Sequence, residues 1–477
     1  MWRAGFGPAV EQLADLSKYT PKQFYKALIK ASDKKPEYIN VADDYLQGLY
    51  MGVEEIGRQQ KKEMTADERK MIQQKNREGV RNLNTFWLHE MVNSAAQLRE
   101  KMAFFWHGHF ACRNLNIFFQ QGLLDVIRKN ALGNFGTLLK EVSKNAAMLN
   151  FLNNQQNKKD HPNENFAREV MELFTLGRGN YTEHDVKEAA RAFTGWSATI
   201  KGEYIFRKGQ HDFGSKTVLG KTGNLEGDDV LDILLQQKST AKFVTQKLYK
   251  FLVNENVDTA KVEWLADRFY KNDYDISKLL EDVFTSDWFY EEKNIGAKIK
   301  SPIELLVGIQ RMLPMKFERE EALQLIQRTL GQLLFYPPNV AGWPSGKNWI
   351  DSSTLMMRMR IPQMLNERDE FNVKPKDDDD QMMGRKDPDE DPKGKAAKMM
   401  GKLNKPILVS IDWSLYTKNY EAVARESLLA NITSTLLQAK SYVSNDLINK
   451  FSDQTGRESF IKTATLQIMS TPEYQLC

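Results

Sequence analysis

The stretch AQLREKMAFFWHGHFA, residues 96–111, is thick with apolar and aromatic residues. A helix with a single apolar stripe lies on a protein surface, whereas a helix that is apolar nearly all round is enclosed by other elements. We therefore expect residues 96–111 to form a helix that is surrounded by other helices.

The same stretch contains two of the six histidines, His107 and His109, separated by Gly108. Neutral imidazole binds zinc, iron, copper or nickel, and it also acts as a base near neutral pH. Residues two apart on a regular helix point about 200° apart, so joint ligation needs the kinked or extended backbone that Gly108 permits. The alternatives are that one histidine serves a site while the other supports the fold, or that both are packed core residues.

Helical patterns continue on both sides of this stretch. The segment TPKQFYKALIKASDK (20–34) begins with a Thr20 cap and with Pro21 at the first helical position, and TEHDVKEAARAFTGW (182–196) carries a Thr182–Asp185 capping box. The segment GEYIFRKGQHDFGSKTVLG (202–220) is typical of a small hairpin. These patterns predict an all-α, multi-helix orthogonal bundle with one small β-hairpin near 203–219.

The composition is that of an ordinary globular protein. Hydrophobic residues make up 41% of the 477 positions and charged residues 27%, and the net charge of +4 is nearly balanced. This balance argues against a nucleic-acid partner that coats the protein generally, although it is compatible with a local basic groove, and we expect no nucleic-acid partner. The two cysteines, Cys112 and Cys477, cannot build a disulfide framework.

No apolar run is long enough for a membrane-spanning helix, and the first residues, MWRAGFGPAVEQL, lack the pattern of a signal peptide. As written, the sequence predicts a cytoplasmic protein, and an upstream leader would make it an exported one. Residues 374–405 are highly charged and broken by prolines, which predicts a disordered insertion. We expect a main helical domain over 1–373, this linker, and C-terminal helices over 406–477 that pack back on the main domain.

The segment HPNENFAREVMELFTLG (161–177) places Glu164, Arg168, Glu169 and Glu172 on one apolar helix. Glu169 and Glu172 share a face, and Arg168 follows Glu164 by four residues and can pair with it. Buried carboxylates must pair, bind metal or take a raised pKa. The segment is therefore either part of a functional site or an ion-pair network that holds helices in register.

A third polar group lies on the predicted hairpin, where His211 and Asp212 are adjacent. A histidine–aspartate pair next to glycine can orient a base or supply metal ligands, and the same composition is common in turns. Arg191 could line a pocket with three tryptophans, although such tryptophans more often fill cores and corners. These are Trp196, Trp343 and Trp349.

None of the common catalytic motifs is present: the sequence has no H-E-x-x-H, Walker loop, G-x-S-x-G elbow or G-x-G-x-x-G after a strand. However, WRAGFG, REKMAFFWHGHFA, PNENFAREVMELFTLGRGNYTEHDVKEAARAFTGW, HDFGSKTVLG and PPNVAGWPSGKNWIDSSTL together resemble one bacterial family, the domain of unknown function 1800. The similarity extends from residue 2 to the end of the chain, and the insertion resembles the Bacteroidota branch.

The resemblance carries no established activity. It implies that polar positions within the family's motifs form a site, and it implies a partner, a sulfatase-like protein encoded nearby. Many members resemble exported proteins, whereas this chain shows no leader. The motif positions are His107, His109, Asn163, Glu164, Asn165, Arg168, Glu169, His211 and Asp212.

Two hypotheses of different classes follow. In the first, the protein is a metal-dependent hydrolase or oxidoreductase that uses zinc or iron. Its metal ligands are His107, His109, Glu169 and His211, and its catalytic residues are Glu164, Arg168, Glu169, Asp212 and Arg191. In the second, it is a non-enzymatic helical scaffold or partner-binding protein whose histidines and glutamates form a structural polar network. A haem protein with His107 or His109 as axial ligand is a third alternative that lacks an attachment motif.

Overall fold

The computed structural model describes residues 1–13, 18–48, 65–367 and 407–477. The described chain is mostly helical with a few small two-stranded antiparallel sheets, which confirms the predicted fold class. The predicted insertion over 374–405 lies outside the described residues.

The helix of residues 97–109, α5 (Gln97–His109), is enclosed by other elements as its sequence predicts. Every residue of α5 except Gly108 is buried. It contacts α2, α4 and α6, and α4 also contacts α15 and α16. The bounds of these helices are α2 (Pro21–Ser32), α4 (Ala66–Asn93), α6 (Ile117–Asn130), α15 (Pro302–Met312) and α16 (Glu321–Thr329).

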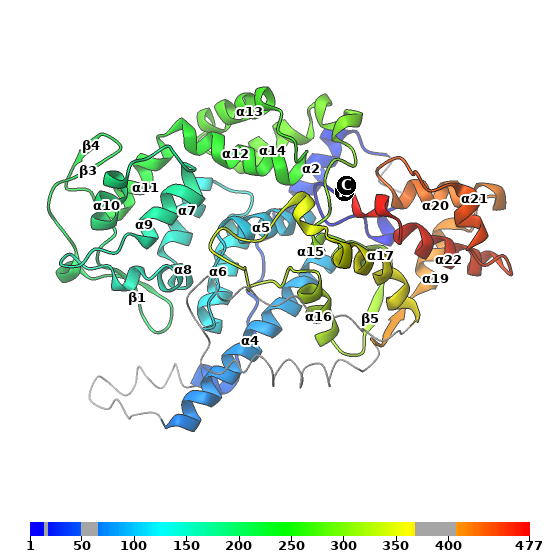
Figure 1. Cartoon of the computed structure of the whole chain (residues 1–477), viewed down its shortest axis with the longest axis horizontal. Coiled ribbons are helices and arrows are strands. Elements are labelled where there is room, and N and C mark those ends of the chain that lie inside the picture. The colour runs from blue at the N-terminus through cyan, green and yellow to red at the C-terminus, as the bar shows by residue number, and fades with distance from the viewer. Residues whose placement is uncertain (14–17, 49–64, 368–406) are drawn as a thin grey trace.

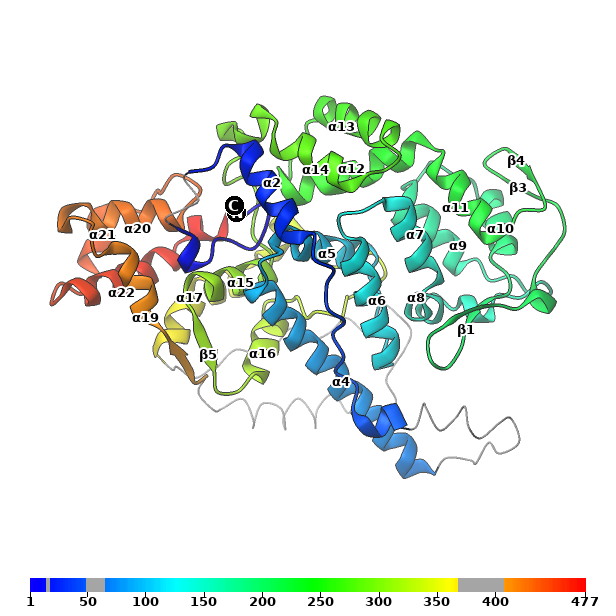
Figure 2. The ribbon, with the colours of Figure 1, turned by 180° about the vertical axis from the view of Figure 1, so that it is seen from behind.

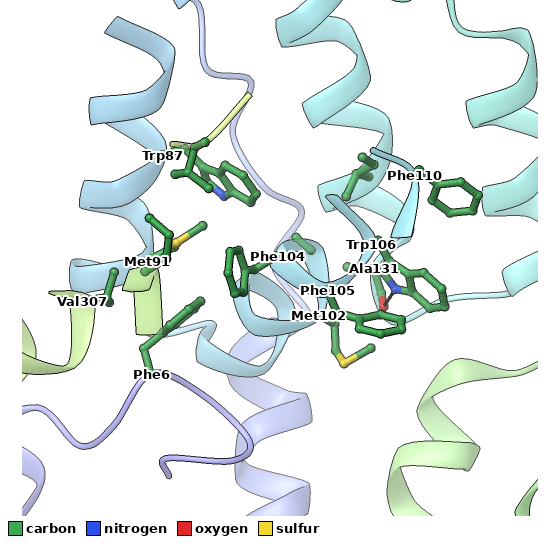
Figure 3. Packing of buried hydrophobic residues seen from close by; sticks show 14 of the residues in the cluster. Phe6, Trp87, Met91, Met102, Phe104, Phe105, Trp106, Phe110, Ala131 and Val307 are labelled. Carbon is green, nitrogen blue, oxygen red and sulfur yellow. Dashed lines mark hydrogen bonds between the residues drawn. The ribbon is translucent and has the colours of Figure 1, made fainter. Parts of the chain in front are cut away.

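Aromatic side chains fill the space on opposite sides of α5. Figure 3 shows Phe104 directed towards Phe6, Trp87 and Met91, while Trp106 lies on the other side of the helix. The indole of Trp106 donates a hydrogen bond to the Ala131 carbonyl oxygen at 3.0 Å, so that this large buried side chain keeps its polar atom paired.

The middle of the chain, residues 135–284, extends from the left side to the top of the molecule in Figure 1 and from the right side to the top in Figure 2. The predicted Thr182–Asp185 capping box is present at the start of α10. The helices of this part are α7 (Phe135–Lys144), α8 (Ala146–Phe151), α9 (Asn165–Glu169), α10 (Glu183–Ala192), α11 (Gly227–Leu235), α12 (Lys238–Leu252), α13 (Thr259–Lys271) and α14 (Ile276–Phe284).

Strand pairing occurs where the hairpin is predicted, but the segment divides between two hairpins. Strand β1 (Trp196–Ala198) pairs with β2 (Tyr204–Phe206), and β3 (Lys216–Val218) pairs with β4 (Lys221–Gly223). His211 and Asp212, which lie between β2 and β3, form no ladder: His211 bonds to the Thr194 carbonyl just after α10, and Asp212 binds Arg191 in the last turn of α10.

The C-terminal helices lie on the opposite side of α5 and α15 from α7–α11 (Figures 1 and 2). Strand β5 (Met315–Phe317) pairs with β6 (Val409–Ile411), and α17 contacts α22. Ile299 also forms an isolated bridge with Leu476. The helices are α17 (Ser352–Glu367), α19 (Trp413–Thr417), α20 (Leu428–Leu436), α21 (Asn445–Lys450) and α22 (Arg457–Met469).

Candidate functional site

Helix α5 continues without a break through His107 and Gly108 to its last residue, His109, and the N–H of the following residue, Phe110, bonds to the Trp106 carbonyl. Side chains two positions apart on such a helix point in very different directions. The kink at Gly108 that joint ligation by both histidines requires is absent, and the two imidazoles therefore lie in different surroundings.

His107 lies among aromatic rings. Its ring centroid is 5.0 Å from that of Trp87, 4.9 Å from Phe335 and 5.2 Å from Trp343. The Phe335 backbone N–H donates a hydrogen bond to Nε2 at 3.3 Å, so a neutral ring carries its proton on Nδ1. Burial lowers the pKa of His107 from 6.5 to about 3, because charging this ring would leave an ion without water.

His109 contacts a different part of the chain. Its Nε2 donates a hydrogen bond to the Phe174 carbonyl oxygen at 3.1 Å, which leaves Nδ1 as a buried lone pair without a hydrogen-bonding partner among the described residues. Burial, and then the nearby Lys247 ammonium, hold the pKa of His109 well below its usual value. His109 is therefore neutral at pH 7, with its proton on the opposite nitrogen from that of His107.

Helix α9 continues into a π-helical turn, Val170–Thr175, in which the Leu176 N–H bonds to the Met171 carbonyl, five residues earlier. A π-turn changes the direction of the carbonyl groups that follow it. His109 bonds to the Phe174 carbonyl, and the Lys247 ammonium lies 3.5 Å from the Leu173 carbonyl. These two side chains therefore satisfy the carbonyl-rich end of the turn, where a positive charge is also favourable.

Lys247 is a half-buried cation that the sequence did not point to. Burial lowers its pKa to about 8, and its ammonium lies 5.2 Å from the centre of the Phe243 ring. The sequence signal is weak, because Lys247 occupies an ordinary position of an amphipathic helix and its partner, the Leu173 carbonyl, is 74 residues away.

The predicted pairing of Arg168 with Glu164 is present, with a distance of 3.1 Å, and Arg168 also binds Glu183 at 2.7 Å. Glu172 is paired with Arg178 at 2.9 Å and accepts a hydrogen bond from the Tyr181 hydroxyl. These carboxylates thus form surface and half-buried ion pairs on α9 and the turn that follows it.

Glu169 differs from its neighbours because it has no hydrogen bond or ion pair with any described residue. Burial and the neighbouring Glu172 carboxylate raise the pKa of this half-buried side chain. A carboxylate that is partly removed from water without a cation is costly, and the same feature is common in functional sites.

The His211–Asp212 pair of the hairpin region does not act as one unit. His211 Nδ1 donates to the Thr194 carbonyl at 2.8 Å, and its Nε2 is buried without a hydrogen-bonding partner among the described residues. Asp212 instead binds the Arg191 guanidinium at 2.7 Å, which holds the pKa of this carboxyl below its usual value. Arg191 also binds Glu188 at 2.8 Å, so its charge is neutralised by two carboxylates.

The ring contacts of the three tryptophans do not bring them together around Arg191 as the predicted pocket requires. Trp343 packs on His107, whereas Trp196 packs against Phe166 and Phe193. Trp349 is buried in the segment that precedes α17. The tryptophans thus occupy separate places, and none of them contacts Arg191 in a ring interaction.

The sequence-predicted site residues therefore belong to separate groups: His107 with the loop that follows α16, His109 with the π-turn, and His211, Asp212 and Arg191 with the loop beside α10. Within residues 1–13, 18–48, 65–367 and 407–477, no group of three or more histidine, cysteine, aspartate or glutamate side chains is placed to hold a metal ion. The predicted four-ligand centre of His107, His109, Glu169 and His211 is thus not formed by these residues.

The loop beside His107 is fixed on α5 by a close backbone contact. Gly342 has φ +88°, and a Cβ atom there would lie 2.5 Å from the Gly108 carbonyl oxygen. We expect Gly342→Ala to lower the free energy of unfolding by about 2–4 kcal/mol, because it adds a backbone clash to the cost of a left-handed conformation. Urea unfolding followed by circular dichroism measures this loss.

Gly331→Ala is the matched control. Gly331 has φ +83°, but a Cβ atom there would meet no other atom within 4 Å. The control therefore isolates the backbone cost, which is about 1–2 kcal/mol. Equal losses in the two variants would contradict the proposed contact between Gly342 and Gly108.

The structure is that of a mostly helical protein. None of its described helices is long and apolar enough to cross a membrane. The family follows from the sequence: the chain belongs to the DUF1800 family, described as a protein of unknown function, whose model matches residues 1–476. Comparison with curated proteins and with solved structures found no match.

Proposed function

We propose that the protein is a helical scaffold or partner-binding protein in which His107, His109 and His211 are buried structural groups, the first two of them neutral. One observation supports this proposal: each imidazole forms a hydrogen bond with the backbone of another segment of the chain. The partners are the Phe335 N–H, the Phe174 carbonyl and the Thr194 carbonyl. Buried hydrogen bonds of this kind fix the register of packed segments, because an unpaired partner costs about 1–3 kcal/mol.

The family resemblance supports a partner for such a scaffold, the sulfatase-like protein encoded nearby. Co-expression of the two proteins, followed by affinity purification on either one, tests whether they bind each other. A stable complex remains together during purification. Recovery of both proteins in constant ratio supports the pairing, and recovery of each protein alone counts against it.

A second candidate, a zinc- or iron-dependent enzyme, is supported by a different observation. The Nδ1 atom of His109 and the Nε2 atom of His211 are buried lone pairs without described hydrogen-bonding partners, and Glu169 is an unpaired carboxylate. Nitrogen and oxygen atoms of this kind bind divalent metals. If the protein is a metal-dependent enzyme, we expect its metal to bind at one of these three residues, and substitutions there test this candidate first.

His109→Gln and Glu169→Gln distinguish the two candidates. A scaffold loses about 1–3 kcal/mol of unfolding free energy in His109→Gln and less than about 1 kcal/mol in Glu169→Gln, since only His109 has a backbone partner. An enzyme with zinc or iron bound at His109 or at Glu169 loses that metal in the variant of the residue that binds it. Elemental analysis and urea unfolding of the untagged protein provide both readouts.

A further inference from the structure

A cavity of about 230 Å³ lies where residues 1–4 meet α2 and the segment that follows α14. Figures 1 and 2 show α2 beside α14, and the two helices are in contact. In size the cavity lies between a hollow of about 150 Å³, which holds one benzene molecule, and the pockets of about 300–1,000 Å³ that hold drug-sized ligands. Its volume therefore fits a single aromatic ring or a short aliphatic chain.

The walls of the cavity are mostly apolar. Phe24 and Leu28 line it from α2, and Phe289 and Ile295 line it from the segment after α14. Ile295 is 40% exposed although it is a large apolar side chain. Apolar surface that water still reaches gains free energy when a ligand covers it, so these walls favour an apolar ligand.

The two phenols that line the cavity already use their hydroxyl protons. The Tyr25 hydroxyl donates to the Ser277 carbonyl oxygen, and the Tyr290 hydroxyl donates to the Phe284 carbonyl oxygen at 2.8 Å. Among the lining residues that the structure describes, Arg3 alone has a charged side chain. Arg3 is therefore the group that selects the polar end of a ligand.

The Arg3 guanidinium is held in a fixed place. Its Nη1 donates to the Phe289 and Asn294 carbonyl oxygens at 2.9 and 3.1 Å, and its central carbon lies 3.5 Å from the centre of the Phe289 ring. The Asn294 side chain is buried and bonds to the Trp288 carbonyl and the Asn254 amide, which anchors this turn. A ligand therefore binds an arginine that is already ordered, which lowers the entropic cost of binding.

Arg3 keeps its charge and part of its hydrogen-bonding capacity. Burial lowers the pKa of its guanidinium to about 10, against the opposing attraction of Cys477 and Tyr290, so the group is charged at pH 7. Its N–H groups on Nε and Nη2 form no hydrogen bond or ion pair with a described residue. These N–H groups lie in one plane, and their spacing matches the two oxygen atoms of a carboxylate.

We propose that the cavity binds a small carboxylic acid, with its carboxylate paired to Arg3 and its aromatic or short aliphatic body packed against Phe24, Leu28 and Phe289. One guanidinium balances the single charge of a carboxylate. A phosphate dianion would leave an excess negative charge in apolar surroundings, which is costly. The site thus favours a monocarboxylate over a phosphate ester.

The proposal goes beyond the scaffold function and does not depend on it, because ligand binding at this cavity is measured directly. The probes are phenylacetate and its uncharged counterpart, phenylethyl alcohol, which have the same apolar body. Isothermal titration of the full chain is expected to show saturable binding of phenylacetate, at least about tenfold tighter than binding of the alcohol. The difference arises because the bond to a charged guanidinium adds to the shared apolar contacts.

Two variants separate the charged end of the site from its apolar walls. Arg3→Gln is expected to weaken phenylacetate binding by about tenfold and to change binding of the alcohol by less than about twofold. Phe24→Ala removes apolar contact area and is expected to weaken binding of both probes several-fold. Arg319→Gln, a change of an exposed arginine just before α16, is the matched control and is expected to leave both affinities unchanged.

Arg3→Lys replaces Arg3→Gln if the latter fails to fold as judged by circular dichroism. Lysine keeps the charge but lacks the planar pair of donors, so phenylacetate binding is expected to weaken several-fold. Absence of saturable phenylacetate binding, or equal affinities for the acid and the alcohol, would overturn the proposal. Unchanged phenylacetate binding in the folded Arg3 variant, or the same loss in Arg319→Gln, would also overturn it.

Discussion

Replacing Glu304 by glutamine is expected to lower the free energy of unfolding by about 3–5 kcal/mol. Glu304 lies in the first turn of α15, where its carboxylate forms ion pairs with both Lys101 and Lys298. All three side chains are almost completely removed from solvent. Loss of the carboxylate leaves two ammonium groups in the core without their counter-charge.

The surroundings of Glu304 explain the size of this effect. Burial would raise the pKa of the Glu304 carboxyl, but the two lysines outweigh it and hold the pKa far below the usual range. Burial also lowers the pKa of Lys101 to about 8 despite the attraction of Glu304. The same carboxylate accepts a hydrogen bond from the Ser301 backbone N–H at 2.8 Å and so completes the capping box of α15.

Glu263→Gln is the matched control for this prediction. Glu263 forms an ion pair with Lys242 at 3.0 Å, and both side chains are at least half exposed. Exposed pairs contribute about 0–1 kcal/mol, so this variant is expected to unfold at nearly the same urea concentration as the parent protein. A loss below about 1 kcal/mol in Glu304→Gln would show that water reaches the charges around α15.

Acidification is expected to destabilise the folded protein through His107. Because the pKa of this residue falls from 6.5 in the unfolded chain to about 3 in the folded protein, only the unfolded chain binds the proton between these values. The contribution of His107 to stability is therefore complete above pH 6.5, and it decreases by about 1.4 kcal/mol per pH unit as the pH falls towards 3. The full loss is about 5 kcal/mol.

Comparison of the parent protein with His107→Gln isolates this contribution, since other groups also titrate in this range. Glutamine retains an acceptor for the Phe335 N–H but has no proton to gain. The difference in unfolding free energy between the two proteins is expected to change by about 2 kcal/mol between pH 6.5 and 4.5. His161→Gln, a change of an exposed histidine, serves as the control. A constant difference across this pH range would mean that His107 is not a buried neutral group.

Local patterns in the sequence predicted the parts of the structure that depend on neighbouring residues. The apolar density of residues 96–111 predicted the enclosed helix α5, and capping residues predicted the starts of α2 and α10. The i,i+4 spacing of Glu164 and Arg168 predicted their ion pair. In each case the interacting groups lie within a few positions of one another, where helical geometry fixes their relation.

Partners that are distant in the chain could not be predicted in this way. The partner of His107 is 228 positions away, and that of Lys101 is 203 positions away. The charged residues Arg99, Glu100 and Lys101 inside the apolar stretch are the one visible signal that buried ion pairs exist there. Their partners become known only when the whole fold is known.

The predicted metal site shared by the histidines and Glu169 depended on the backbone conformation at Gly108 and in the segment 161–177, and the sequence does not determine either conformation. Gly108 permits a kink, but α5 is regular there, and the loop that holds Gly342 packs directly on the Gly108 carbonyl. Within the segment 161–177, residues 165–175 are helical, and Val170–Thr175 form a π-helix, which a pattern of apolar spacing does not reveal.

The central claim is that His107 and His109 are neutral, separately bonded structural groups on one regular helix. Nitrogen-15 NMR of histidine side chains, assigned with His107→Gln and His109→Gln, tests this most directly. We predict that neither ring titrates between pH 7 and 5, and that His107 carries its proton on Nδ1 and His109 on Nε2. Titration of either ring near pH 6.5, or the same tautomer in both rings, would contradict it.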